Sequence, residues 1–397
     1  GNVMVDDDSP HGQLAAVGVA FLLAIAVNRT LRAEGWYRDR PEPDLMSWLD
    51  LVALGTVCDV VPLTGVNRAL VAQGLKVMAR RGNPGLAALA DVARMTEAPE
   101  AWHAGYLLGP RVNAGGRVGE AGLGTALLTA PDYATALPIA QKLDAWNAER
   151  RDIEAACLEQ AIVQVESGTL HDGLVYVAAE GWHPGVIGIV AGRLKERYNR
   201  PACVVAMDGA TGKGSGRSVT GVDLGAAVIA ARQSGLLVNG GGHAMAAGFT
   251  VSAGLQDDLR RFLADRIAAQ TGPGGPVAEL RLDGTLQPRG ATTELTAALQ
   301  MLAPFGAGNR EPRFALPAVR IVQADIVGGD HVRCILAGED GGRLKAIAFR
   351  CANRPLGELL LRSGGLPVHV AGQLRSDRWQ GRESVQLIVE DAAPTTG

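Results

Sequence analysis

The segment VYVAAEGWHPGVIGIVAGRLKERYNRPACVVAM (175–207) decides the fold of the middle of the chain. Its two ends, 175–179 and 202–207, are short apolar runs of the length of buried strands. Between them, 186–198 has the spacing of an amphipathic helix. A further apolar run at 245–251 predicts another strand. Strands that alternate with a helix in this way predict an α/β domain over 172–251.

Toward the N-terminus, residues 132–166 form one long helical pattern, about 50 Å at 1.5 Å per residue. We expect it to connect two domains. Residues 11–34 predict one helix; its apolar run, 14–27, is too short to span a membrane, and we expect the helix to be buried. The apolar run 48–61 predicts a buried α/β element that delivers Asp59 to a crevice, and 66–80 predict a helix.

Toward the C-terminus, the Gly- and Pro-rich segment 271–276 predicts a linker. Beyond it the sequence changes to short β-branched segments separated by glycines and polar turns. One helical insert, 292–302, interrupts them. Five or six strands in about a hundred residues favour a small barrel, with the oligonucleotide-binding (OB) barrel as first choice. The segments are 277–286, 315–327, 331–338, 343–349, 366–376 and 383–392.

Composition restricts the function. The 397 residues are 47% hydrophobic and 20% charged, which is ordinary for a globular protein of two or three domains. The formal net charge of −3 excludes a broad basic coat for nucleic acid, so an anion-binding surface must be local. The five cysteines are scattered, which argues against a zinc knuckle or a disulfide framework and favours a reducing compartment.

Two segments combine glycine with groups that bind anions. In Gly109–Arg117, two arginines and Asn113 flank a Gly pair, and glycine lets backbone amides approach a ligand closely. Taken alone, this segment is better explained as a glycine turn with surface arginines. In Gly181–Val190, His183 precedes a helix whose N-terminus could bind an anion, although His183 could also serve as a cap or a core residue.

Two further segments are more specific. Lys213–Ser218 places a Lys, an Arg and two hydroxyls among small residues, as in a phosphate-binding nest; the alternative is a flexible surface loop. Gly240–Gly242 frees the backbone to wrap a ligand and present His243. A hairpin would explain these glycines but not the histidine.

Carboxylates are candidates for metal binding. Asp59 at the end of its apolar run could be a metal ligand, a helix cap or a turn residue, and alone the cap is favoured. Asp6, Asp7 and Asp8 resemble a metal site, but three consecutive carboxylates usually form a solvated turn.

Six motifs, in order along the chain, resemble the RecJ single-stranded-DNA-specific exonuclease family of the DHH phosphoesterase superfamily. They are ALGTVCDVVPL (53–63), GPRVNAGGR (109–117), GWHPGVIGIVAGRL (181–194), GKGSGRS (212–218), GGGHAMAAG (240–248) and PFGAGNREPRF (304–314). The resemblance implies a 5′→3′ exonuclease of recombination and repair that acts on single-stranded DNA with two Mn²⁺ or Mg²⁺ ions. It also implies four parts: the C-terminal part of a DHH α/β domain (1–130), a connecting helix (131–168), a DHHA1 substrate-binding α/β domain (169–272) and an OB-fold β-barrel (276–393).

The resemblance also assigns roles to individual residues. Asp59 matches a metal-binding motif and, with His243, is expected to be catalytic. The residues expected to bind substrate are Arg111, Asn113, Arg117, His183, Ser215, Arg217, Ser218, Gly240, Gly241, Gly242 and His243.

The sequence departs from the family in one respect. The family's first three motifs, including its D-x-D pair and Asp-His-His, are absent, and Asp59 alone cannot hold two ions. We therefore expect an N-terminally truncated chain that binds DNA weakly and does not cleave it. The alternatives are a phosphodiesterase of short oligonucleotides or cyclic dinucleotides, which the barrel argues against, and a noncatalytic single-strand-binding scaffold. A cytoplasmic monomer is expected; recruitment of a single-strand-binding protein or a helicase is left open.

Overall fold

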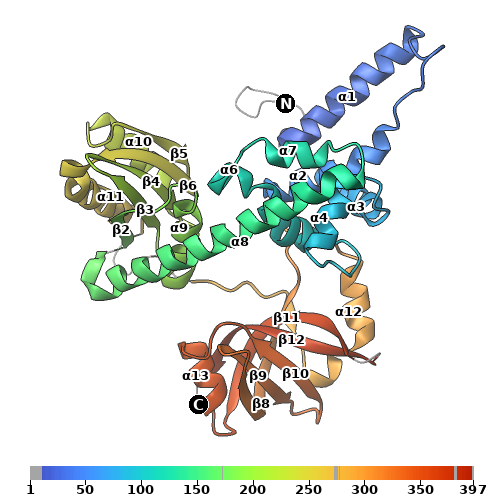
Figure 1. Ribbon diagram of the computed structural model, residues 1–397. Coiled ribbons are helices and arrows are strands. Elements are labelled where there is room, and N and C mark those ends of the chain that lie inside the picture. Colours follow the sequence, from blue (N-terminus) through green and yellow to red (C-terminus); the bar gives the residue numbers. More distant parts are fainter. Residues whose placement is uncertain (1–10, 172, 272–275, 277, 380–381, 396–397) are drawn as a thin grey trace. The chain divides into compact units, whose positions relative to one another are not determined.

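The computed structural model describes residues 11–171, 173–271, 276, 278–379 and 382–395 (Figure 1). Asp6, Asp7, Asp8 and most of the predicted linker lie outside these residues. The contacts divide the chain into two compact units. One comprises 1–79, 99–104 and 279–397, and the other comprises 80–98 and 105–278.

The second unit begins with helices that surround a long one. The helices are α4 (Pro84–Val92), α5 (Gly109–Val112), α6 (Gly115–Val118), α7 (Leu123–Leu128) and α8 (Tyr133–Gln164), with the wide-turn segments η2 (His103–Leu108) and η3 (Val165–Thr169). Asp132 caps α8 by accepting a hydrogen bond from the Thr135 amide. The first half of α8 packs against α4–α7 and its second half against the sheet and α9, all within this unit.

A six-stranded sheet with the order β1-β2-β3-β4-β6-β5 forms the rest of this unit. Its strands are β1 (Leu170–His171), β2 (Leu174–Glu180), β3 (Ala202–Asp208), β4 (Thr211–Arg217), β5 (Asn239–His243) and β6 (Ala246–Ser252). The helices are α9 (Ile187–Tyr198), α10 (Leu224–Gln233) and α11 (Gln256–Thr271), with the short η4 (Ala253–Leu255). β2 and β3 are parallel and joined through α9, which confirms the predicted strand–helix–strand unit.

The two faces of this sheet are covered differently. One face packs against α10 and α11, in a core that includes Val205, Leu224 and Leu263. The other packs against α8 and α9, in a core that includes Val204, Val190 and Ala161 (Figure 1). α9 covers this second face over β3 and β4. The side-chain positions on the same face of β4, β6 and β5 line a pocket instead.

The first unit contains helices and the C-terminal barrel. Its helical elements are α1 (Ala16–Ala33), η1 (Leu45–Trp48), α2 (Leu49–Cys58), α3 (Gly65–Ala79), η5 (Pro288–Gly290), α12 (Thr293–Gln300) and α13 (Pro355–Arg362). Its strands are β7 (Gly284–Thr285), β8 (Arg313–Val327), β9 (His331–Ala337), β10 (Arg343–Ala348), β11 (Pro367–Trp379) and β12 (Arg382–Pro394).

The strands β8, β9, β10, β12 and β11 pair in that order, and β11 pairs again with β8 to close the barrel. β10 and β12 are parallel while the other pairs of the closed circuit are antiparallel, and α13 lies between β10 and β11 in the chain. This is the five-stranded barrel that the sequence predicts.

Four predicted elements differ from the structure. Within 48–61, residues Leu49–Cys58 form the helix α2, and Asp59 lies exposed at its C-terminal end, not in a crevice at the end of a buried α/β element. The segment 277–286 contributes only the two-residue strand β7. The Lys213–Ser218 segment, expected as a phosphate-binding nest, is mostly strand β4, which excludes the alternative of a flexible surface loop. α1 is largely exposed: among its residues only Gly18, Phe21 and Asn28 are buried.

The exposure of α1 has a simple cause. Only its Phe21 side packs against apolar residues of η1 and α2, so Leu23 is 65% exposed. α1 is the one helix of the described chain that is long and apolar enough to cross a bilayer, although core helices of soluble proteins meet the same criterion.

Candidate phosphate-binding site

Three rows of residues cross β4, β6 and β5 on the face that α9 covers in part, and the start of α9 borders them. Directly paired residues of antiparallel strands point to the same face. One row is Lys213–Thr250–Asn239, the next is Ser215–Gly248–Gly241, and the third is Arg217–Ala246–His243. The alternation of β4 therefore presents a lysine, a serine and an arginine on one face.

Gly214 and Gly216 alternate with these polar residues along β4, and their positions face the opposite side of the sheet, where no room is left for a Cβ. A Cβ at Gly216 would lie 2.6 Å from Leu224 of α10, and one at Gly214 would overlap the Phe249 ring. Small residues at these positions let β4 pack closely against the helical core. The glycine-rich sequence that suggests a loop is thus a strand with one crowded face and one functional face.

Arg217 is held in place by its own strand. Its Nη1 donates to Ser215 Oγ at 3.2 Å and to the Gly216 carbonyl at 2.8 Å. The first bond turns the guanidinium toward the middle row. Burial lowers the pKa of Arg217, and the positive charge of Arg117 lowers it further. Both effects disfavour the bare cation, so an anion at this place would be stabilised.

Arg117 reaches the same region from α6. Its Nη1 donates to the Gly185 carbonyl at 3.0 Å, and Gly185 must be glycine because a Cβ there would collide with the Arg117 carbonyl. The pKa of Arg117 is lowered first by burial and then by Arg150, while Glu154 opposes these effects. Within the described chain, neither Arg117 nor Arg217 forms an ion pair with a carboxylate.

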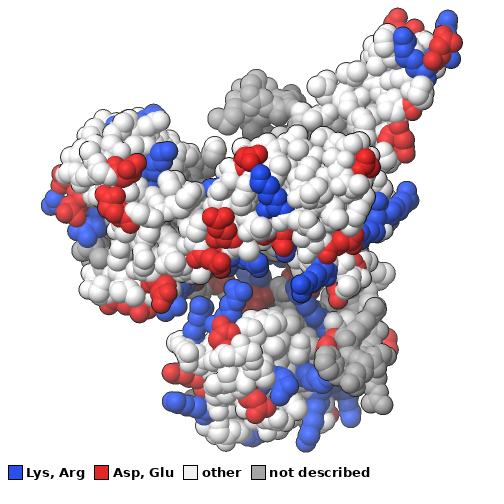
Figure 2. Space-filling view, in the orientation of Figure 1, with Lys and Arg blue, Asp and Glu red and all other residues white. Residues whose placement is uncertain are grey.

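These residues line a pocket of about 610 Å³. Its lining includes Arg117, Lys213 and Arg217 and no acidic residue. Gly188, Gly241 and Gly248 also line it; a Cβ would meet no atom closer than 4.0 Å at the last two and would touch Arg217 and Ser215 at Gly188. The positive charge is local, since acidic and basic side chains are mixed over the face shown in Figure 2.

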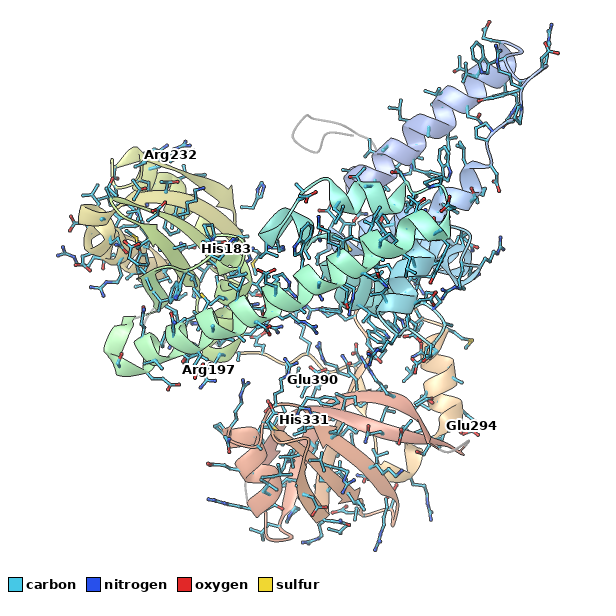
Figure 3. All side chains as sticks on the ribbon, viewed as in Figure 1. His183, Arg197, Arg232, Glu294, His331 and Glu390 are labelled. Atoms are coloured by element: carbon cyan, nitrogen blue, oxygen red, sulfur yellow. The ribbon has the colours of Figure 1, made fainter. Side chains whose placement is uncertain are left out.

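His183 lies in the segment between β2 and α9 (Figure 3). Its Nδ1 accepts a hydrogen bond from the Gly185 amide at 3.0 Å, so the neutral ring carries its proton on Nε2. His183 is not among the lining residues, but it fixes the Gly185 backbone, which binds Arg117. His183 thus orders the Gly185 backbone beside the pocket.

The pocket includes only part of the predicted substrate-binding set. Arg117, Ser215, Arg217, Gly240 and Gly241 line it. His243 is exposed on the same face, in the row of Arg217, but is not a lining residue; Gly242 and the exposed Asn113 also lie outside the lining.

Two predicted residues are occupied by structural contacts. The Arg111 side chain is 11% exposed; its Nε donates to Asp144 of α8 at 2.8 Å and its Nη1 donates to the Leu107 carbonyl at 2.7 Å. The Ser218 side chain is buried, and its hydroxyl donates to the Val222 carbonyl at 2.8 Å. In the structure, the polar groups of Arg111 and Ser218 thus contact other parts of the protein, whereas the sequence predicts that they contact substrate.

Asp59 belongs to the other unit, at the C-terminal end of α2, where it is exposed. A carboxylate at this end of a helix faces unpaired carbonyls, which favours a cation nearby. In the described part of the chain, however, no group of three or more His, Cys, Asp or Glu residues could hold a metal ion. The described residues therefore do not by themselves fit a two-metal site.

Lys213, Asn239, Thr250 and Gly188 are lining residues that the predicted substrate-binding set omits. The alternation of β4 is the signal for Lys213, since it shares a face with Ser215 and Arg217. Asn239 and Thr250 depend on the pairing of β5 with β6 and of β6 with β4, which a local pattern does not show.

Comparison with known proteins agrees with this architecture. The family model described as "DHHA1 domain" matches residues 171–269, and "RecJ OB domain" matches residues 282–391. The "Single-stranded-DNA-specific exonuclease RecJ" of Dickeya dadantii is 37% identical over 399 residues, which cover 97% of this chain and 68% of the relative. This chain belongs to the RecJ exonuclease family.

Other RecJ proteins support the assignment. The Escherichia coli RecJ is 36% identical, over 98% of this chain and 69% of the relative. Crystal structures of Thermus thermophilus RecJ with Mg²⁺ and with Mn²⁺ match with TM-scores of 0.79 and 0.80 at 31% identity, over 96% of this chain. The matches cover 56% and 53% of those chains. This chain thus spans about two thirds of these curated relatives and about half of the Thermus chains.

Proposed function

We propose that the pocket of Arg117, Ser215 and Arg217 binds the 5′-terminal phosphate of single-stranded DNA, as the substrate-holding part of a 5′→3′ exonuclease. The observation that carries this proposal is the pair of guanidiniums in the pocket. Burial lowers the pKa of the half-buried Arg217 and, although its side chain is more exposed, that of Arg117, and neither pairs with a carboxylate of the described chain. A phosphate dianion supplies the missing negative charge and accepts the remaining N–H donors.

The residues of this chain act by holding and orienting. Ser215 and the Gly216 carbonyl fix Arg217, and the Gly185 carbonyl fixes Arg117, so both donors are ordered before a ligand arrives. The glycines of the middle row leave room for the ligand above the sheet. Because these groups are fixed in advance, little ordering entropy is lost on binding.

Hydrolysis of the phosphodiester requires groups beyond this pocket. Two-metal chemistry would supply a metal-activated water for in-line attack. Asp59 is the residue of this chain that we propose as a metal ligand, because it matches the family motif. In addition, a bound cation would offset the unfavourable interaction of its carboxylate with the carbonyl end of α2.

We further propose that the protein acts in the cytoplasm, because its DNA substrate lies in that compartment. We also propose that it is a monomer. A single-strand-binding protein and a helicase are the protein partners to test.

The test compares two short DNA pentamers that differ only in a 5′-phosphate or a 5′-hydroxyl, bound to this chain in EDTA. We expect the phosphorylated strand to bind about tenfold more tightly, since one charge-assisted contact contributes roughly 1.5–3 kcal/mol. Arg217→Met should remove this preference. Arg261→Met is the matched control, because Arg261 lies on α11, which covers the opposite face of the sheet, and pairs with Asp258. Equal affinity of the wild type for both strands would contradict the proposal.

A further inference from the structure

The pocket extends beyond the place where the two arginines meet. Its volume of about 610 Å³ is in the range of pockets that bury a whole small molecule, and is more than one phosphate requires. The far end is formed by the row Lys213–Thr250–Asn239. This row has no role in the proposed binding of the terminal phosphate.

Lys213 is available for an anion. It lines the same pocket as Ser215, and the ammonium of its exposed side chain forms no ion pair or hydrogen bond with any residue that the structure describes. Its neighbours in the row can contribute polar groups. The Oδ1 of Asn239 already accepts the Gly240 amide at 2.8 Å, so the Asn239 side chain offers its NH₂ group to a ligand.

The distances between rows suit a second phosphate. Alternate residues of a strand are separated by about 6.8 Å, so the Lys213 row lies about 6.8 Å from the Ser215 row. The Arg217 guanidinium is turned toward Ser215. Between the two positions, the floor contains Gly241 and Gly248, where no side chain fills the space. A ligand whose two phosphates are separated by a nucleoside can therefore reach both rows, whereas the β-phosphate of a diphosphate requires the long, exposed Lys213 side chain to extend toward Ser215.

We propose that Lys213, with Asn239 and Thr250, forms a second phosphate subsite in the pocket. The proposal rests on the proposed binding of a phosphate by Arg117 and Arg217. The second phosphate has two chemical sources: the β-phosphate of a 5′-diphosphate end, or the phosphate on the 3′ side of the first nucleoside.

The test measures dissociation constants of this chain for three probes, in EDTA and at constant ionic strength. The probes are thymidine 5′-monophosphate, thymidine 5′-diphosphate and thymidine 3′,5′-bisphosphate. We expect the 5′-diphosphate, the 3′,5′-bisphosphate or both to bind about tenfold more tightly than the monophosphate. The probe that gains the affinity identifies the source of the second phosphate.

Substitutions test whether Lys213 and Asn239 cause the gain in affinity for the second phosphate. Lys213→Met should reduce the affinity for the favoured probe to that for the monophosphate, and should change the monophosphate affinity less than twofold. Asn239→Ala should give a smaller loss of the same kind, about threefold. Lys195→Met is the matched control, because Lys195 lies on α9, near Glu196 and outside the pocket lining.

Two results would overturn the subsite. One is equal affinity of the wild type for all three probes. The other is a Lys213→Met variant that weakens the monophosphate as much as the favoured probe, which would mean that Lys213 shares the first phosphate. These results differ from a failure of the proposed function. In that case the Arg217→Met variant and the wild type would bind the monophosphate with equal affinity.

Discussion

Arg217 and His243 lie in one row of the sheet and on the same face, with Ala246 between them. Only Arg217 lines the pocket. Its guanidinium is half-buried and fixed by two hydrogen bonds, whereas His243 is exposed near the end of the edge strand β5. The two residues should therefore contribute unequally to the binding of DNA.

We expect Arg217→Ala to weaken the binding of a 5′-phosphorylated single strand by about 10- to 100-fold, the loss of one charged contact. His243→Ala should weaken it less than fivefold. Fluorescence anisotropy with a labelled pentamer measures both. A larger effect of His243→Ala would mean that the histidine is the main phosphate donor.

Two glycines on opposite faces of the sheet provide a second prediction. A Cβ at Gly214 overlaps the Phe249 ring, so Gly214→Ala should lower the free energy of unfolding by about 1–3 kcal/mol. A Cβ at Gly241 meets no atom within 4 Å, so Gly241→Ala should leave stability unchanged. It should instead weaken the binding of phosphate ligands, because the new methyl group enters the pocket. Thermal unfolding and ligand titration of both variants separate the two effects.

Ser215 and Ser218 lie three residues apart but have different environments. Ser215 lines the pocket, while the buried Ser218 donates to the Val222 carbonyl. Ser218→Ala should cost about 1 kcal/mol of stability and leave DNA affinity unchanged, because it leaves that carbonyl without this hydrogen bond. Ser215→Ala should do the reverse, since Arg217 loses a partner in the pocket. If Ser218→Ala weakened DNA binding with no loss of stability, the structural role of Ser218 would be wrong.

The sequence predicted the elements whose periodicity is strong. The apolar runs at 175–179 and 202–207 became β2 and β3, the pattern at 186–198 became α9, and 132–166 became α8. β2 and β3 are buried almost continuously, as expected for strands covered on both faces, and the buried residues of α8 and α9 recur every three or four residues. The closed barrel follows from the same kind of pattern in short segments.

The failures have tertiary causes. β4 has loop-like composition, yet it is a strand because Phe249 and Leu224 leave room only for glycine on one face. The ion pair of Arg111 with Asp144, 33 residues away, is likewise a tertiary contact that no local pattern shows, and the predicted role of Arg111 in substrate binding stays a prediction. The exposure of α1 could not be read from its hydrophobicity, which predicts burial whether or not the described chain supplies a covering surface.

Asp50 provides a prediction about pH. It lies in the first turn of α2, its side chain is almost fully buried, and its Oδ1 accepts the Leu51 amide. Burial raises the pKa of this carboxyl above its ordinary value, while its backbone hydrogen bonds oppose that effect. The folded state therefore holds the proton more tightly than the unfolded state.

The sign of the effect on stability follows from this difference. Below the pKa of the unfolded state both states are protonated, and the contribution of Asp50 is fully present. As the pH rises through the raised pKa of the folded state, the charged carboxylate must be kept in its buried position and this contribution is lost. Asp50→Asn removes the titration, so it should raise the Tm at pH 7 relative to the wild type. The difference should shrink as the pH falls to about 4, the ordinary pKa of an aspartate. Thermal unfolding of both proteins between pH 4 and pH 8 measures it, with Asp39→Asn as the exposed control. A variant whose Tm gain stays the same across this range would show that the charge of Asp50 does not limit stability.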